Sequence, residues 1–181
     1  MEQNITLEQI ITFLLETPMF EELDAEELSQ IVHIMQMQRV ANGHPIFSEG
    51  DHGDSWYVLF SGQAKVTKNT PFGPDRDVVT LQPHACFGEM AILDGSARSA
   101  TVSALGLCHV FRFPRIAFQK LLEEDNLGAF KLVHGMARVL SQRQRRLTTQ
   151  VSELMEELED DTKPALTRNL GDLIDRYTLS E

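Results

Sequence analysis

The chain has 181 residues, of which 42% are hydrophobic and 24% are charged, and its formal net charge at pH 7 is −11. This composition is that of an ordinary globular protein, and the length allows one well-cored domain with an appendage but excludes two full domains. The negative charge argues against a general nucleic-acid-binding protein, because duplex affinity rests on neutralising phosphates.

The cysteines and the N-terminus indicate a cytoplasmic protein. Cys86 and Cys108 form no CxxC pair and show no metal-ligand spacing, which suits a reducing compartment. The first ten residues, MEQNITLEQI, have no basic region and no apolar run that could cross a membrane. We therefore expect no membrane partner.

Two short helices are predicted at the N-terminus. Residues 5–16 place Ile and Leu at helical spacing, and Pro18 ends that run. In the second segment, residues 21–35, Asp24 is a plausible N-cap and Glu27 lies three residues later, as in a capping box.

The sequence pattern changes from helical periodicity to short β-type runs between residues 37 and 113. Short runs rich in Val, Phe, Tyr and Thr are separated every eight to twelve residues by Gly, Asn, Asp or Pro. This spacing predicts a mostly β fold with flanking helices, an antiparallel barrel of the jelly-roll type with roughly eight strands. The segment NTPFGPDR (69–76) is interpreted as a hairpin tip, and SEGDHGDS (48–55) as a Gly-rich turn.

Helical patterns return after Pro114, first over residues 115–124 and then from about 125 to 160. Apolar residues in the second segment alternate in steps of three and four, which is the a/d pattern of a coiled coil. This seam consists of Phe130, Val133, Ala137, Leu140, Gln144, Leu147, Val151, Leu154 and Leu158, and only Gln144 is polar.

The seam has two interpretations. It can pack on the barrel, or it can join two copies of the chain through residues 130–158, and at ~1.5 Å per residue a helix of this length outruns a domain of this size. We therefore expect a homodimer. Pro164 is expected to break the helix, which divides the chain into a barrel with N-terminal helices (1–124), a long dimerisation helix (125–162) and a short acidic helical tail (163–181).

Residues 87–102, FGEMAILDGSARSATV, carry the strongest chemical signal. Gly88 allows a sharp turn and a close approach, after which the amides of Met90 and Ala91 open a helical turn and suit an anion. Glu89 is an acceptor-only group that fits a sugar hydroxyl, and the Arg98 guanidinium matches two phosphate oxygens. Together they describe a nucleotide pocket. The alternative is that Glu89 and Arg98 pair on the surface, a contact usually worth ~0–1 kcal/mol.

This stretch resembles the phosphate-binding cassette of cyclic nucleotide-binding domains, as found in catabolite activator protein and in the regulatory subunit of protein kinase A. The resemblance covers about residues 15–160 and includes the strands PIFSEGD and WYVLFSGQAKV. Gly50, Gly53 and Gly62 match turn positions of the family and are interpreted as structural. The cassette residues on the family pattern are Gly88, Glu89, Ala91, Arg98, Ser99, Ala100, Thr101 and Val102.

The resemblance implies that Arg98 and the amides near Met90, Ala91 and Ser99 hold the cyclic phosphate, while Glu89 takes the ribose 2′-hydroxyl. The expected ligand is cyclic AMP, by family frequency, or cyclic GMP. No catalytic residue, metal or cofactor is implied.

Two departures from the family are visible. Only about twenty residues, with a small net negative charge, follow Pro164, where the family's transcription factors carry a DNA-binding winged helix, so the chain resembles a stand-alone bacterial member and direct DNA binding is not expected. Where the activator offers a Thr-Ser pair to the base, this chain has Arg143 and Gln144. Gln144 either sets the register of the coiled coil or places an amide beside a purine edge.

The sequence therefore predicts a dimeric, non-enzymatic cyclic nucleotide sensor that acts through an unknown protein effector by ligand-biased movement of the long helix. A second possibility is a degenerate sensor that keeps the fold as a dimerising interaction module. A third is a metal-dependent cupin, which the six scattered histidines do not favour because no HxH motif occurs. A fourth, DNA binding through the basic segment from Lys131 to Arg146, is weaker, since such a segment more often meets solvent or an acidic partner.

Overall fold

The computed structural model describes the backbone of residues 5–70 and 73–178 and the side chains of 5–70 and 73–155. The chain forms two compact units, residues up to 139 and residues from 140 onward. Its helices are α1 (Leu7–Leu15), the 3-10 helix η1 (Pro18–Phe20), α2 (Ala25–Val32), α3 (Met90–Asp94), α4 (Arg115–Glu123) and α5 (Leu127–Thr178). Its strands are β1 (Gln36–Val40), β2 (Pro45–Phe47), β3 (Ser55–Lys68), β4 (Arg76–Leu81), β5 (Cys86–Phe87) and β6 (Thr101–Pro114).

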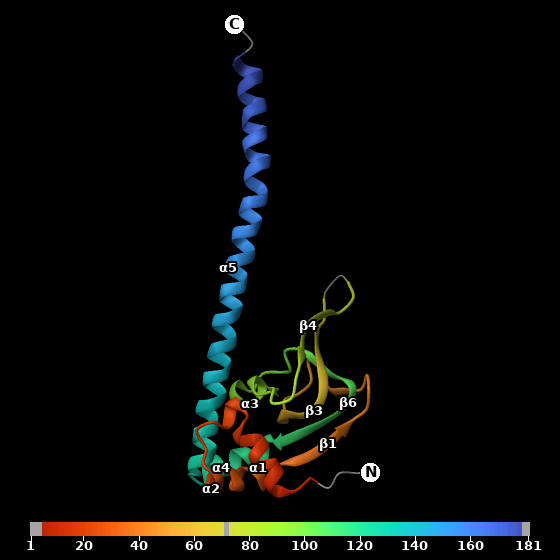
Figure 1. Ribbon diagram of the computed structural model, residues 1–181, viewed down its shortest axis with the longest axis vertical. Coiled ribbons are helices and arrows are strands. Elements are labelled where there is room, and N and C mark those ends of the chain that lie inside the picture. The colour runs from red at the N-terminus through yellow and green to blue at the C-terminus, as the bar shows by residue number, and fades with distance from the viewer. Residues whose placement is uncertain (1–4, 71–72, 179–181) are drawn as a thin grey trace. The chain divides into compact units, whose positions relative to one another are not determined.

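Both predicted N-terminal helices are present, and local capping explains where they begin. The Asp24 carboxylate accepts from the amides of Glu26 and Glu27, and the Glu27 side chain accepts from the Asp24 amide, which confirms the capping box. The side chain of Thr6 caps α1 in the same way, with Gln9 as its reciprocal partner. Together with α4, these helices lie at one end of the sheet (Figure 1).

The sheet has six strands among the described residues, so the prediction of roughly eight was wrong. β3 and β6 run 14 residues each and pair antiparallel along their length. Each of them occupies a stretch in which the predicted spacing of eight to twelve residues would place more than one strand. Gly62, read from the sequence as a turn residue, lies inside β3 at φ +84°, where the register against β6 shifts. A Cβ at this position would lie 2.3 Å from the Leu107 carbonyl oxygen, so a bulge that only glycine fits replaces the expected turn.

The predicted closed barrel is also corrected. The strand order is β1-β6-β3-β4, with β2 added on β6 and β5 on β3, and this path does not return to its first strand within the described residues. The observed fold is a mostly antiparallel sheet with flanking helices.

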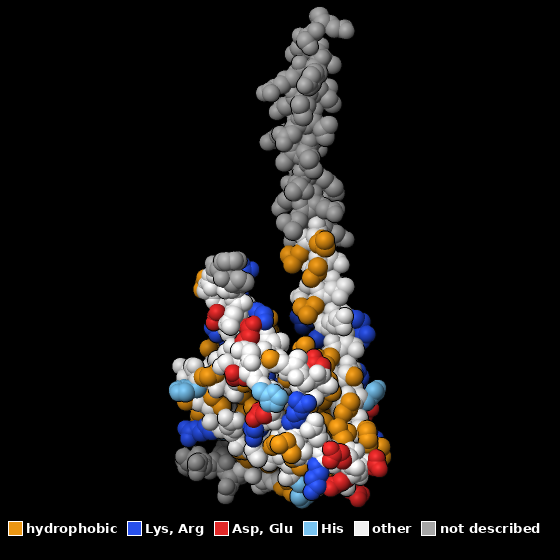
Figure 2. All heavy atoms as spheres, turned by 180° about the vertical axis from the view of Figure 1, so that it is seen from behind, with side chains coloured by type: hydrophobic (Ala, Val, Ile, Leu, Met, Phe, Trp, Pro, Cys, Tyr) orange, Lys and Arg blue, Asp and Glu red, His pale blue; other side chains and the backbone are white. Residues whose placement is uncertain are grey.

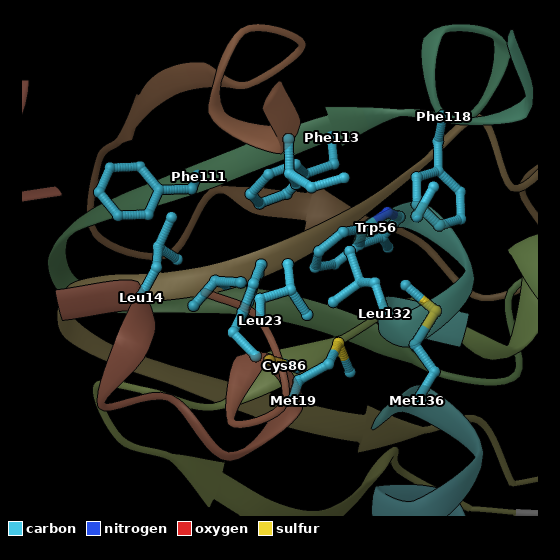
Figure 3. Close-up of a cluster of buried hydrophobic side chains, with 14 of the residues drawn as sticks. Leu14, Met19, Leu23, Trp56, Cys86, Phe111, Phe113, Phe118, Leu132 and Met136 are labelled. Atoms are coloured by element: carbon cyan, nitrogen blue, oxygen red, sulfur yellow. The ribbon is translucent and has the colours of Figure 1, made fainter. Parts of the chain in front are cut away.

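Two apolar clusters cover the two faces of the long strands. Trp56 and Val58 pack with residues of the helices in one cluster. Tyr57 and Leu59 belong to the other cluster, which consists of strand and loop residues. This alternation explains why the run SWYVLF is continuously apolar: both faces of the strand are buried. Figure 3 shows the helix-side cluster, in which Trp56 stacks on Phe113 with ring centroids 4.0 Å apart.

The first part of α5 belongs to the helix-side cluster through one face. Ala129, Leu132 and Met136 are fully buried, whereas Phe130 on the seam is 48% exposed. A Cβ at Gly135 would lie 2.2 Å from the Met19 carbonyl oxygen, so the helix backbone approaches η1 closely. The α5 residues that pack into the helix-side cluster therefore do not belong to the a/d seam. Val133 is the exception, since it is a seam residue that is partly buried against the same cluster.

Basic residues at the start of α5 pair with acids of the N-terminal helices. Lys131 Nζ lies 2.6 Å from Glu27 Oε1, and Arg138 Nη2 lies 2.6 Å from Glu21 Oε2. Part of the basic segment thus meets an acidic partner inside the same chain, as such segments commonly do.

Pro164 does not end the long helix, contrary to the prediction, because α5 is helical without interruption from Leu127 to Thr178. A proline inside a helix removes one backbone donor and costs ~3 kcal/mol. The helix can continue through it because the hydrogen bonds of the turns before and after the proline are still formed. No helix in the described part of the chain is both long enough and apolar enough to span a membrane.

Candidate functional site

The cassette, residues 87–102, folds as the sequence predicts, with a strand that gives way to one short helix. β5 ends at Phe87, Gly88 follows at φ +78°, and α3 begins at Met90 and closes at Gly95 in the left-handed conformation. The first amides of a helix have no intrahelical acceptor, which leaves those of Met90 and Ala91 open to an anion.

Arg98 is buried, with 3% of its surface exposed. Its Nη1 donates to the Gly88 carbonyl at 2.9 Å and its Nη2 donates to the Ser55 carbonyl at 2.6 Å. The guanidinium carbon lies 4.2 Å from the centre of the Phe47 ring. Burial lowers the pKa of Arg98, while Tyr57 and Asp54 nearby act in the opposite direction. The guanidinium is therefore a cation held inside the fold on backbone carbonyls and an aromatic face.

The Nε of Arg98 is buried and has no hydrogen-bond partner within the described residues. An unsatisfied charged donor inside a protein is costly, and this observation itself points to a missing acceptor. A phosphate oxygen is the acceptor that a guanidinium edge matches best.

Glu89 is buried as well, with 2% of its surface exposed. The alternative of a surface pair between Glu89 and Arg98 is therefore wrong, because neither side chain lies on the surface. Ser99 is exposed and Ala100 half-buried, so the cassette contributes both interior and surface groups.

The Gly-rich turn 48–55 has a larger part in the site than the sequence indicated. Gly50 N donates to the Arg98 carbonyl, and Arg98 N donates to the Asp51 carbonyl, both at 2.9 Å. Asp54 Oδ1 lies 3.6 Å from Arg98 Nη2. The turn thus packs directly against the cassette at Arg98. The acidic residues of the turn are evident in the sequence, but no nearby sequence motif predicts that they lie beside Arg98.

A polar clamp that the sequence did not reveal holds the end of the cassette. Lys68 Nζ donates to the Ser99 carbonyl at 2.7 Å and forms an ion pair with Glu49. Glu49 N donates to Thr101 Oγ1 at 2.9 Å. The hydrogen bond from Lys68 is the largest cause of a lowered pKa at the Glu49 carboxyl. These contacts join β3, the turn and β6 across long sequence separations.

Arg143 and Gln144 lie on α5 in the unit from residue 140 onward, and both side chains are exposed. The other predicted ligand residues, from Gly88 to Ala100, lie in the first unit. The base-recognition role of the pair stays a prediction.

Replacing Gly88 by alanine is expected to destabilise the fold by about 2–5 kcal/mol. The positive φ contributes ~1–2 kcal/mol, and the new Cβ would lie 2.7 Å from Arg98 Nη1 and 3.3 Å from the Phe47 ring, a crowding that adds ~1–3 kcal/mol. Gly43→Ala is the matched control, because Gly43 has φ +75° with no atom within 4 Å of its Cβ position. Chemical denaturation measures both variants, and equal losses would mean that the guanidinium does not crowd Gly88.

The chain is similar to known proteins in both sequence and structure. The sequence pattern described as Cyclic nucleotide-binding domain matches residues 37–125. A cAMP-dependent protein kinase regulatory subunit from Yarrowia lipolytica is 36% identical over 110 residues, which are 61% of this chain and 28% of that protein. The crystal structure of Thermus thermophilus catabolite activator protein is similar with a TM-score of 0.67 and 28% identity, covering 76% of this chain and 62% of that one.

A third relative is the regulatory domain of Toxoplasma gondii PKA, co-crystallised with cAMP. It is similar with a TM-score of 0.61 and 27% identity, covering 71% of this chain and 48% of that one. This chain spans less than two thirds of the length of each of these three proteins. The residues matched by the family pattern include the whole cassette and the turn that faces it. Residues 37–125 of this chain therefore belong to the cyclic nucleotide-binding domain family.

Proposed function

We propose that this protein is a cytoplasmic, non-enzymatic cyclic nucleotide sensor whose ligand is cyclic AMP. The observation that carries the proposal is the buried guanidinium of Arg98, whose Nε has no acceptor in the described structure. A cyclic phosphate in the cassette would supply that acceptor and would also meet the open amides at the start of α3.

Each cassette residue has a role in this proposal. Arg98 and the amides near Met90, Ala91 and Ser99 hold the phosphate, Gly88 and Ala100 leave room for the ligand, and Glu89 accepts from the ribose 2′-hydroxyl. The name of the Yarrowia lipolytica relative mentions cAMP, and the Toxoplasma gondii domain was crystallised with it, which supports cyclic AMP over cyclic GMP. Arg143 and Gln144 would present side-chain donors and an acceptor to the base edge.

The output would pass through α5 as part of a homodimer. Leu147, Val151 and Leu154 of the seam are 61%, 54% and 57% exposed, and Figure 2 shows hydrophobic side chains at the surface of the described end of α5. An exposed a/d stripe of this kind is what a second copy of the helix would cover. Ligand binding would then bias the position of α5, and an effector protein would read the change.

A thermal-shift experiment with cyclic AMP and cyclic GMP tests the ligand. A nucleotide present at about 100 times its dissociation constant adds ~2.7 kcal/mol to the free energy of unfolding, which raises Tm by about 5–10 °C for a chain of this size. The expected order is cyclic AMP above cyclic GMP, with 5′-AMP as the control. An unchanged Tm with both cyclic nucleotides at millimolar concentration would instead favour the degenerate sensor.

A further inference from the structure

The polar clamp at the end of the cassette fixes the peptide group that joins Ser99 to Ala100. The Ser99 carbonyl accepts from Lys68 Nζ at 2.7 Å. The peptide is trans, so its carbonyl and its amide point in opposite directions. Because the carbonyl is directed to Lys68, the Ala100 amide is directed away from Lys68.

The preceding peptide group, between Arg98 and Ser99, is fixed by the Gly-rich turn. Its carbonyl accepts from Gly50 N at 2.9 Å. Ser99 is therefore held by the turn through one peptide and by Lys68 through the other. Among the residues that the structure describes, neither the Ser99 amide nor the Ala100 amide has an acceptor. These two amides are open backbone donors beside Arg98, and Lys68 makes one of the two contacts that orient them.

Lys68 is itself held in place by Glu49. Its ammonium forms an ion pair with Glu49 Oε1, and the second oxygen, Oε2, accepts from the Asn69 amide at 2.9 Å. The Glu49 amide donates to Thr101 Oγ1 at 2.9 Å, so the backbone of Glu49 is fixed as well. The Glu49 side chain is 18% exposed, whereas that of Lys68 is 51% exposed. A partly buried carboxylate thus orients a more exposed lysine before any ligand is present, which lowers the entropic cost of holding the Ser99 carbonyl.

We propose that Lys68 is a positioning residue of the nucleotide site: held by Glu49, it fixes the backbone of Ser99 so that the open amides of Ser99 and Ala100 meet the cyclic phosphate beside Arg98. The inference rests on the proposed function for its consequence, which is nucleotide affinity. Its structural half, the fixed direction of the peptide between Ser99 and Ala100, stands on the contacts of Lys68. In this proposal Lys68 acts through the backbone and does not contact the ligand.

Calorimetric titration of the full chain with cyclic AMP measures the consequence. Lys68→Met is expected to weaken binding about fivefold, because the released peptide has to be ordered again when the phosphate binds. The matched control is Lys65→Met, which removes the same charge from β3. Lys65 pairs with Asp77 of β4 at 3.0 Å and makes no contact with the cassette, so its loss should change the affinity by less than about twofold.

Glu49→Gln separates positioning from a direct attraction between the Lys68 charge and the phosphate. The substitution removes a negative charge close to the cassette, and by charge alone it would strengthen the binding of an anion. Positioning predicts the opposite sign, because Lys68 loses the ion pair that orients it. Glu49→Gln should therefore weaken binding about threefold, within the range of a partly exposed ion pair.

Two results would overturn the inference: an affinity of Lys68→Met within twofold of wild type, or unchanged or tighter binding in Glu49→Gln. If the wild-type protein binds neither cyclic nucleotide, the proposed function fails, and the backbone half of the inference is still tested without ligand. The amide nitrogen of Ala100 shares its peptide group with the Ser99 carbonyl, so its NMR resonance should move in Lys68→Met and stay in place in Lys65→Met. An Ala100 resonance that is the same in Lys68→Met and wild type would refute the positioning role.

Discussion

Arg98→Ala is expected to lower the affinity for cyclic AMP by at least ~100-fold. The substitution removes two charge-assisted hydrogen bonds to the phosphate, each worth ~1.5–3 kcal/mol, and every 1.4 kcal/mol is a factor of ten. The guanidinium is buried over the Phe47 ring and held on two backbone carbonyls, so its position is fixed by the fold. The loss should appear in the dissociation constant, measured by calorimetry.

Arg98→Lys separates the ligand contact from the structural contacts. The two Nη atoms of Arg98 donate to the Gly88 and Ser55 carbonyls, which lie on different segments. A lysine ammonium has a single nitrogen and cannot bridge both carbonyls in this way. Lysine keeps the positive charge, so the affinity of the Arg98→Lys variant for cyclic AMP should lie between those of wild type and Arg98→Ala. Tm in the absence of ligand reports how much either variant disturbs the fold. An alanine variant that folds and binds cyclic AMP within threefold of wild type would contradict the assignment of Arg98 as the phosphate anchor.

Val151→Asp is expected to convert a dimer into a monomer at low micromolar protein concentration. The seam would bury this position against its copy on the second helix, and two unpaired carboxylates there would raise the dissociation constant at least ~100-fold. Val151 is 54% exposed in the single chain, so the variant should not disturb the monomer fold. Light scattering after size-exclusion chromatography gives the mass directly.

The adjacent Ser152→Asp is the matched control for the dimer. It adds the same charge one residue away, on an exposed position outside the a/d pattern, and should leave the dimer intact. A wild-type protein that stays monomeric as its concentration rises, or a dimer that tolerates Val151→Asp, would rule out dimerisation through the seam.

An acidic chain can still bind an anion where the fold buries a cation. The net charge is −11, yet Arg98 is withdrawn from the surface and held on the Gly88 and Ser55 carbonyls. Net charge is a sum over the whole molecule, so it argues against a nucleic-acid-binding surface and does not argue against a small phosphate ligand.

Several features were predictable because contiguous residues encode them. The Asp24–Glu27 capping box, the position of α4 and the strand-to-helix turn at Gly88 depend on neighbours within a few positions, and all three are confirmed. The glycines were harder to interpret. Gly62 allows a positive φ in either a turn or a bulge, and only pairing with β6 shows that the strand continues.

The sequence by itself determined the cassette: its residue types, its turn and its candidate anion anchor all lie within residues 87–102. Only the tertiary structure decided what that anchor touches. Ser55 lies 43 positions from Arg98, and Lys68 lies 31 positions from Ser99. Such contacts follow from the register of β3 and β6, and register is set by the packing of whole strand faces. The chemistry of the site is therefore local in the chain, whereas the burial and the charge balance of Arg98 are properties of the folded sheet.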